Sequence, residues 1–257
     1  MVDQNELDFA VEIAREAGAL TRSWFERPDL TVEVKSDGSP VTVADRAAEQ
    51  LLRDRIVARF PDDAIVGEEQ ADRVGTSGRT WVLDPIDGTK SFTHGVPLYA
   101  TLVALVDQDG PAIGVIEMPS VSETVWAGRD LGAHHNGAPT HVSPTSSVSG
   151  AWLMTSGLRV WKTGAIDRVL DAGVHLRTWA DAYGYALVAT GRADAMVDPI
   201  ANYWDLVAPS VIISEAGGVF TDVVGHDGPD GGSGLATAGP IHDELLELLA
   251  DCADLRS

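Results

Sequence analysis

Apolar residues recur at three- and four-residue steps in two stretches near the start of the chain, residues 3–25 and 42–60. This spacing predicts two amphipathic helices, each with one buried face. The inward-facing positions are Leu7, Val11, Ala14, Gly18 and Thr21 or Phe25 in the first helix, and Ala48, Leu51, Leu52, Ile56 and Phe60 in the second. Between the helices, residues 30–34 alternate as a strand does, and residues 35–40 (KSDGSP) have the composition of a turn.

Shorter apolar runs predict a sheet in the rest of the first half of the chain. We expect strands at residues 64–66, 81–83, 99–106, 112–118 and 124–127, and turns at residues 107–111 and 132–139. The strands expected at residues 99–106 and 112–118 lie directly on either side of the turn at residues 107–111, so we expect these two strands to pair with each other.

Small polar residues with proline and glycine fill residues 143–150 (SPTSSVSG), which makes this segment the best linker candidate. After it, strands and helices alternate. We expect strands at residues 152–156, 195–197, 219–222 and 235–238, and helices at residues 164–172, 182–191, 205–216 and 241–255. The pattern therefore predicts an N-terminal α+β half, residues 1–142, and a C-terminal α/β half, residues 143–257, in stacked layers.

The charge and the cysteine content of the chain restrict its possible partners and its cellular location. The 257 residues carry a net charge of −21, which argues against a nucleic-acid or anionic-membrane partner. No apolar run is long enough for a transmembrane helix, and the acidic start, residues 1–16, lacks the features of a signal peptide. The single cysteine, Cys252, excludes an internal disulfide, so we expect a cytoplasmic protein.

Four carboxylates lie where predicted strands give way to loop or helix: Glu68, Asp84, Asp87 and Asp205. In open sheets, ligand sites gather at such strand ends. If the four side chains converge, their charges raise one another's pKa unless cations neutralise them. Mg²⁺ prefers oxygen ligands of this kind, and Ile86 can add its backbone carbonyl. The same cations would attract an anionic substrate that the acidic chain as a whole repels.

Each of these carboxylates also has a structural interpretation. Asp84 and Asp87 are of a residue type common in turns. Asp205 can be the N-cap of its helix, and Glu68 can be a solvated charge in a loop. Thr42 followed by Asp45 fits a capping box, which would make Asp45 structural. What favours a functional interpretation is that all of them occur in one recognisable order.

Two long motifs, residues 81–89 (WVLDPIDGT) and 204–218 (WDLVAPSVIISEAGG), and two short ones, residues 67–69 (GEE) and 42–45 (TVAD), provide that order. Together they resemble the inositol monophosphatase family over nearly the whole chain. The resemblance implies an αβαβα sandwich, shared with fructose-bisphosphatases. It also implies a Mg²⁺-dependent phosphatase that acts on a small-molecule phosphomonoester, binds two or three Mg²⁺ ions and forms a homodimer.

The resemblance assigns the metal ligands residue by residue. Glu68, Asp84 and the carbonyl of Ile86 would hold the first metal. Asp84, Asp87 and Asp205 would hold the second, and Glu68 would reach a third, weaker one.

The resemblance also assigns the phosphate and the attacking water. The backbone N–H groups of Gly88 and Thr89 would bind the phosphate at a helix start, and Lys35 would close over it. Asp45 and Thr89, hydrogen-bonded to each other, would orient and deprotonate the water together with the metal ligand Glu68. No covalent phosphoenzyme is expected.

Within the family, residues 84–92 (DPIDGTKSF), 177–191 (RTWADAYGYALVATG) and 195–199 (AMVDP) most resemble the histidinol-phosphate phosphatase branch. This resemblance implies hydrolysis of L-histidinol phosphate to L-histidinol and phosphate in histidine biosynthesis.

The leaving group of that substrate carries an ammonium group and an imidazole, and such groups favour a pocket with extra carboxylates. The residues expected to contact it are Asp87, Asp181, Asp198 and Asn202. Asp181 can equally be a helix N-cap, and Asp198 can be a turn residue before a proline.

Three other functions remain open from the sequence. The first is an inositol-1-monophosphatase or another small sugar or nucleotide phosphatase of the same family. The second is a non-catalytic module that binds metal or phosphate, although every expected ligand position is filled here. The third is a calcium-binding structural protein.

Overall fold

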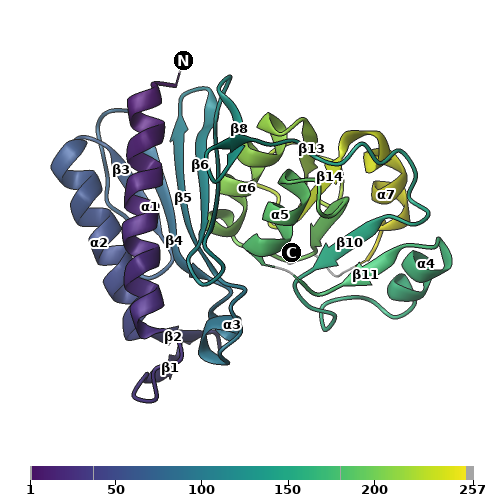
Figure 1. The fold of residues 1–257 in the computed structure, drawn as a ribbon, viewed down its shortest axis with the longest axis horizontal. Helices are drawn as coiled ribbons and strands as arrows, with labels where there is room; N and C mark the ends of the chain where they lie inside the picture. Colours follow the sequence, from purple (N-terminus) through teal and green to yellow (C-terminus); the bar gives the residue numbers. More distant parts are fainter. Residues whose placement is uncertain (1, 37, 180, 253–257) are drawn as a thin grey trace.

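The computed structural model describes residues 2–36, 38–179 and 181–252. Helices and sheets alternate in layers (Figure 1). The first helical layer consists of α1 (Gln4–Trp24) and α2 (Val43–Arg59), and the middle one of α5 (Ala182–Ala189) and α6 (Tyr203–Glu215). The last consists of α4 (Ala165–Asp171) and α7 (His242–Leu248). One sheet lies on each side of the middle layer, so the expected αβαβα sandwich is confirmed.

The N-terminal helices begin and end as their sequences predict. Asp3 caps α1 by accepting a hydrogen bond from the backbone N–H of Asn5. Thr42 caps α2, and the chain leaves that helix at Phe60. Phe60 then packs on Trp81 of the neighbouring sheet, with 5.6 Å between the two ring centroids. The apolar faces of both helices are buried on this sheet, as their spacing indicates.

The first sheet has seven strands. In order across the sheet they are β3 (Ala64–Gly67), β4 (Thr80–Asp87), β5 (Ala100–Asp107), β6 (Gly110–Met118), β7 (Glu123–Gly128), β8 (Gly132–His135) and β9 (Ala138–Pro139). β3 runs parallel to β4, and the remaining neighbours are antiparallel. The sequence therefore predicts the pairing of β5 with β6 correctly.

The second sheet has five strands and lies beyond α5 and α6. In order they are β11 (His175–Arg177), β10 (Trp152–Thr155), β12 (Ala195–Asp198), β14 (Gly234–Ala238) and β13 (Gly218–Thr221). Three short elements complete the fold near the site: β1 (Val32–Val34), β2 (Pro40–Thr42) and α3 (Thr89–Thr93).

The core between the sheets belongs to both halves of the chain. Leu102 and Ile116 of the first sheet pack in one cluster with Met154 of the second and Ile212 of α6. The approach is close enough that a Cβ on Gly114 would lie 2.3 Å from the carbonyl oxygen of Ala208. This packing brings the N-terminal end of α6 against the first sheet. The division of the chain at residue 142 stays a prediction.

Several boundaries differ from the sequence prediction. Residues 132–139, expected to be a turn, form the hairpin β8–β9, which reverses at Asn136 and Gly137 with positive φ angles of 48° and 89°. An Asn-Gly pair of this kind is typical of a two-residue hairpin loop. The last helix ends at Leu248, and positions 253–255 of its expected range lie outside the described residues. None of the helices within the described ranges is both long and apolar enough to span a membrane.

Candidate active site

Asp84 and Asp87 of β4 converge with Asp205 of α6. Each offers a carboxylate oxygen, and the three oxygens lie within 4.8 Å of one another. In a regular strand, residues three apart point to opposite faces of the sheet. The pairing of β4 with β5 is irregular between Asp84 and Asp87, and this irregularity lets both side chains reach the same point.

Asp205 reaches the group from the first turn of α6. The sequence suggested that the helix begins at Asp205, but it begins two residues earlier, at Tyr203, and Asn202 is the N-cap. Asp205 is therefore the third residue of the helix, and its Oδ2 accepts a hydrogen bond from the backbone N–H of Asn202 at 2.7 Å. This bond to the start of the helix fixes the direction of the side chain.

The electrostatics of the group favour an added cation. Burial and the neighbouring carboxylates, Glu68 first among them, raise the pKa of Asp84 well above its ordinary value. Burial and the charge of Asp181 do the same for Asp87. Burial and the charge of Glu68 raise the pKa of Asp205 to about 7. A set of oxygen donors in which Asp84 is buried and Asp87 and Asp205 are half-buried, with so little compensating charge, fits a hard divalent cation.

Glu68 lies beside this group and is paired with a lysine. It follows β3 and influences the pKa values of Asp84 and Asp205. Its Oε1 accepts a hydrogen bond from Lys35 Nζ at 2.7 Å, and the same ammonium group lies 2.6 Å from Oε1 of Glu69. Lys35, expected at the phosphate, thus contacts two carboxylates here.

The expected hydrogen bond between Asp45 and Thr89 is not formed in the structure. Thr89 Oγ1 donates instead to the carbonyl of Ile86 at 3.0 Å. Asp45 Oδ2 accepts from the backbone N–H and the hydroxyl of Thr42, so the capping box is present. Asp45 Oδ1 is buried without a hydrogen-bond partner among the described residues, and burial raises the pKa of this carboxyl to about 6.

Gly88 allows a close approach of two segments. Its φ of 80° is in the left-handed region, which favours glycine, and it is the N-cap of α3. A Cβ here would lie 3.1 Å from Oδ2 of Asp181 and 3.2 Å from the carbonyl oxygen of Leu98. The start of α3 and the carboxylate of Asp181 are therefore immediate neighbours.

A cavity of about 450 Å³ opens beside the carboxylate group. Its acidic lining consists of Asp87, Asp181, Asp198 and Asp205. Burial raises the pKa of Asp198 to about 7. A hydrogen bond from Ser156 lowers this pKa, and the charge of Asp181 raises it further. Asp181 has a φ of 54° and a ψ of −151°, a conformation that costs free energy in a residue with a side chain.

Ser156 links Asp198 and Asp181, two of the residues that the sequence suggested for contact with the leaving group. Ser156 Oγ donates to Asp198 Oδ1 and accepts from the backbone N–H of Asp181 at 3.2 Å. Asp181 occupies the N-cap position of α5 but makes no capping hydrogen bond with its side chain, so capping does not explain it. Asp198 ends β12 and is buried, so it is not an exposed turn residue.

Among the lining residues that the sequence did not predict for the site are Lys90, Ser156, Arg159 and Tyr185. Lys90 lies inside the motif at residues 84–92 (DPIDGTKSF), so its charge in that motif is a sequence signal that could have identified it as a site residue. Ser156 and Arg159 follow a strand in an ordinary loop, which carries no pattern. The Tyr185 hydroxyl is fully buried without a partner among the described residues, and burial and the charge of Asp198 raise its pKa.

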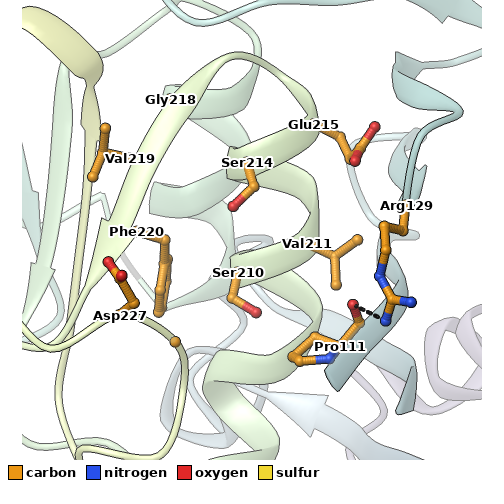
Figure 2. Close-up of a pocket in the computed structure, with 11 residues that line it drawn as sticks. Pro111, Arg129, Ser210, Val211, Ser214, Glu215, Gly218, Val219, Phe220 and Asp227 are labelled. Atoms are coloured by element: carbon orange, nitrogen blue, oxygen red, sulfur yellow. Dashed lines mark hydrogen bonds between the residues drawn. The ribbon is translucent and has the colours of Figure 1, made fainter. Parts of the chain in front are cut away.

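A second cavity, of about 360 Å³, lies at the C-terminal half of α6 (Figure 2). Two of its charged side chains, those of Arg129 and Glu215, already serve the fold. Arg129 donates to Asp107 and to the carbonyl of Pro111, and Glu215 accepts from the backbone N–H groups of Asp130 and Gly132. No residue of the carboxylate group described above lines this cavity, and we do not assign it to the active site.

Comparison with known proteins places this site in a family. Residues 3–254 match the inositol monophosphatase family, and the chain belongs to it. A histidinol-phosphatase of Chlorobaculum parvum is 42% identical over 238 residues, covering 91% of this chain and 92% of its own. A histidinol-phosphatase of Mycobacterium tuberculosis is 38% identical over 257 residues, covering 96% and 99%. The solved structure of an IMPase from Thermotoga maritima is 31% identical, covers 97% and 98%, and superimposes with a TM-score of 0.89.

Proposed function

We propose that this protein hydrolyses L-histidinol phosphate to L-histidinol and phosphate, the reaction that supplies histidinol for histidine biosynthesis. The observation that supports this most directly is the shared cavity. The metal-ligand candidates Asp87 and Asp205 line it together with the half-buried Asp181 and the buried Asp198. The two relatives named histidinol-phosphatase, which match over nearly their full length, support the same substrate.

The metal in this proposal is Mg²⁺, as two or three ions. The residues proposed to hold it are Glu68, Asp84, Asp87 and Asp205, with the carbonyl of Ile86. When bound, Mg²⁺ supplies positive charge for the phosphate and lowers the pKa of the attacking water.

The phosphate and the water are held by the residues around α3. We assign the phosphate to the backbone N–H groups of Gly88 and Thr89, with Lys35 able to approach once it leaves its carboxylate partners. Asp45 Oδ1, which is buried and has no partner among the residues that the structure describes, is the atom we assign to accept a hydrogen bond from the water. Thr89 Oγ1 and Glu68 complete the set that orients the water.

The leaving group distinguishes histidinol phosphate from the alternatives. Its ammonium group can form charge-assisted hydrogen bonds with Asp181 and Asp198, which line the cavity together with Asp87. We propose that Asn202, the N-cap of α6, also contacts the leaving group, although it is not among the residues that line the cavity. Inositol 1-phosphate and most other sugar phosphates offer only hydroxyl groups there. Two carboxylates are a poor match for such groups, because neutral hydroxyls compensate their charge less than an ammonium group does.

The experiment that tests this proposal compares kcat/KM for histidinol phosphate with kcat/KM for inositol 1-phosphate in saturating Mg²⁺. We expect a preference for histidinol phosphate of at least about tenfold. Equal values would contradict histidinol phosphate as the preferred substrate but would not contradict the phosphatase activity. The homodimer and the cytoplasmic location expected from the sequence remain proposals alongside it.

A further inference from the structure

Glu49 of α2 is a fully buried carboxylate that the proposed chemistry does not use. Its Oε1 accepts a hydrogen bond from Arg53 Nε at 2.8 Å, one helical turn further on. A buried ion pair gains little net stability, because desolvating both charges opposes their attraction. Stability is therefore a weak explanation for this pair, and its other contacts indicate a different role.

The same carboxylate holds the backbone that follows Glu68. Its Oε2 accepts from the N–H of Glu69 at 2.8 Å, and its Oε1 accepts from the N–H of Gln70 at 3.1 Å. Arg53 adds two hydrogen bonds, to the carbonyls of Gln70 and Ala71, both at 3.1 Å. The ion pair therefore binds three successive residues directly after Glu68.

The residue before Glu68 is adapted to this contact. A Cβ on Gly67 would lie 2.5 Å from Oε1 of Glu49 and 2.9 Å from Nη2 of Arg53, so glycine leaves the space that the ion pair fills. The N–H of Glu68 itself donates to the carbonyl of Leu83 at 3.2 Å. The backbone is thus held on both sides of the Glu68 side chain.

We propose that Glu49 is a positioning residue, which fixes the carboxylate of Glu68 for the divalent cation by binding the amides of Glu69 and Gln70. The inference rests on the proposed function, which makes Glu68 a metal ligand. Lys35 Nζ, 2.7 Å from Glu68 Oε1, is a competing partner for that carboxylate. The affinity of the site for metal therefore depends on where the backbone holds Glu68.

The test is the variant Glu49→Gln, which keeps the shape of the side chain and replaces one of its oxygens by an N–H donor. Mg²⁺ binding to metal-free protein is measured by titration calorimetry, with thermal unfolding and kcat in parallel. We expect the Kd for Mg²⁺ to rise about tenfold, while kcat at saturating Mg²⁺ changes by less than about threefold. The control is Glu117→Gln, at a buried carboxylate bonded to Thr124 Oγ1. It should lower thermal stability and leave the Kd within about twofold.

An unchanged Kd for Mg²⁺ in Glu49→Gln would overturn the inference, whatever its thermal stability. If that variant does not fold, Arg53→Lys is measured instead. It keeps the charge beside Glu49 and loses the hydrogen bonds to the loop carbonyls, so we expect a Kd raised about threefold, and an unchanged Kd overturns the inference. Wild-type protein that binds no Mg²⁺ overturns the proposed function and this inference together. Wild-type protein that binds Mg²⁺ no better than the variants overturns this inference alone.

Discussion

The carboxylate of Asp87, at the end of β4, accepts a hydrogen bond from the backbone N–H of Ala182, the first residue of α5. This contact joins the two halves of the chain at the candidate active site. It holds one member of the carboxylate group directly against the helix whose N-cap position is Asp181. A change at Asp87 should therefore be felt by the metal and by the substrate pocket together.

Asp87→Asn should abolish Mg²⁺-dependent turnover without unfolding the protein. The amide oxygen can still accept the bond from Ala182, but the variant has one anionic ligand fewer. We expect kcat to fall at least about 100-fold. Thermal unfolding without metal should show equal or higher stability, because burial and neighbouring carboxylates raise the pKa of Asp87 and its removal relieves that repulsion.

The matched control for this variant is Asp109→Asn, which removes the same charge from an exposed side chain in the turn after β5. It should leave kcat unchanged. Turnover retained in Asp87→Asn would contradict the metal site.

Ser156→Ala should weaken substrate selection more than catalysis. The hydroxyl donates to the carboxylate of Asp198 and accepts from the backbone N–H of Asp181, and without it these two residues lose their common partner. We expect KM for histidinol phosphate to rise about fivefold to tenfold, and KM for inositol 1-phosphate to change by less than about twofold. Steady-state kinetics on both substrates measure this. Equal changes on both would show that Ser156 serves the fold and not the leaving group.

Lys90 and Arg159 should attract the anionic substrate. Both line the cavity of a protein whose net charge of −21 repels a phosphate ester at long range. We expect the double variant Lys90→Gln/Arg159→Gln to lose about threefold to tenfold in kcat/KM at low salt. The loss should shrink towards zero near 1 M salt, where the screening length is about 3 Å. A loss independent of salt would instead indicate direct contacts with the substrate.

How far the sequence predicts the site depends on the residue. Asp84, Asp87 and Asp205 stand in long motifs whose order is informative, and the structure brings them together. Ser156 and Arg159 are single loop residues, and only the folded chain places them beside the carboxylates. The partner of Thr89 was wrongly predicted because hydrogen bonds depend on side-chain direction, which the pattern does not specify.

In the fold, too, long patterned segments are predicted correctly and short ones are not. Long periodic segments predict α1, α2, β5 and β6 to within a few residues. The strands β2 and β11 were missed, because each has three residues and β11 has no fully buried position. The hairpin at residues 132–139 was taken for a turn because its Asn-Gly pair was not recognised as a hairpin loop. The apolar pattern of β4 does not predict the register irregularity between Asp84 and Asp87, on which the site depends.

His242 should make the folded state less stable in acid. Burial lowers its pKa below the ordinary value, and its ring nitrogens contact the hydroxyls of Thr221 and Thr237. As the pH falls, the unfolded chain binds a proton at His242 first, near pH 6.5, so acidification favours unfolding. The contribution of His242 is present above about pH 6.5 and is lost as the pH falls through the folded pKa.

His242→Gln should therefore reduce the loss of stability between about pH 7.5 and 5. Urea unfolding of both proteins across this range measures the difference, in which the titrations of all other groups cancel. Parallel pH profiles would show that His242 has the same pKa in the folded and unfolded chain.

We propose that carboxylates distant in the sequence share divalent cations at one point. Anomalous diffraction from crystals of the wild-type protein soaked in Mn²⁺, an oxygen-seeking substitute for Mg²⁺, tests it most directly. We predict density peaks among Asp84, Asp87 and Asp205, with one beside Glu68 whose appearance displaces the ammonium group of Lys35. Mn²⁺-supported turnover with no peak at these carboxylates would contradict the account.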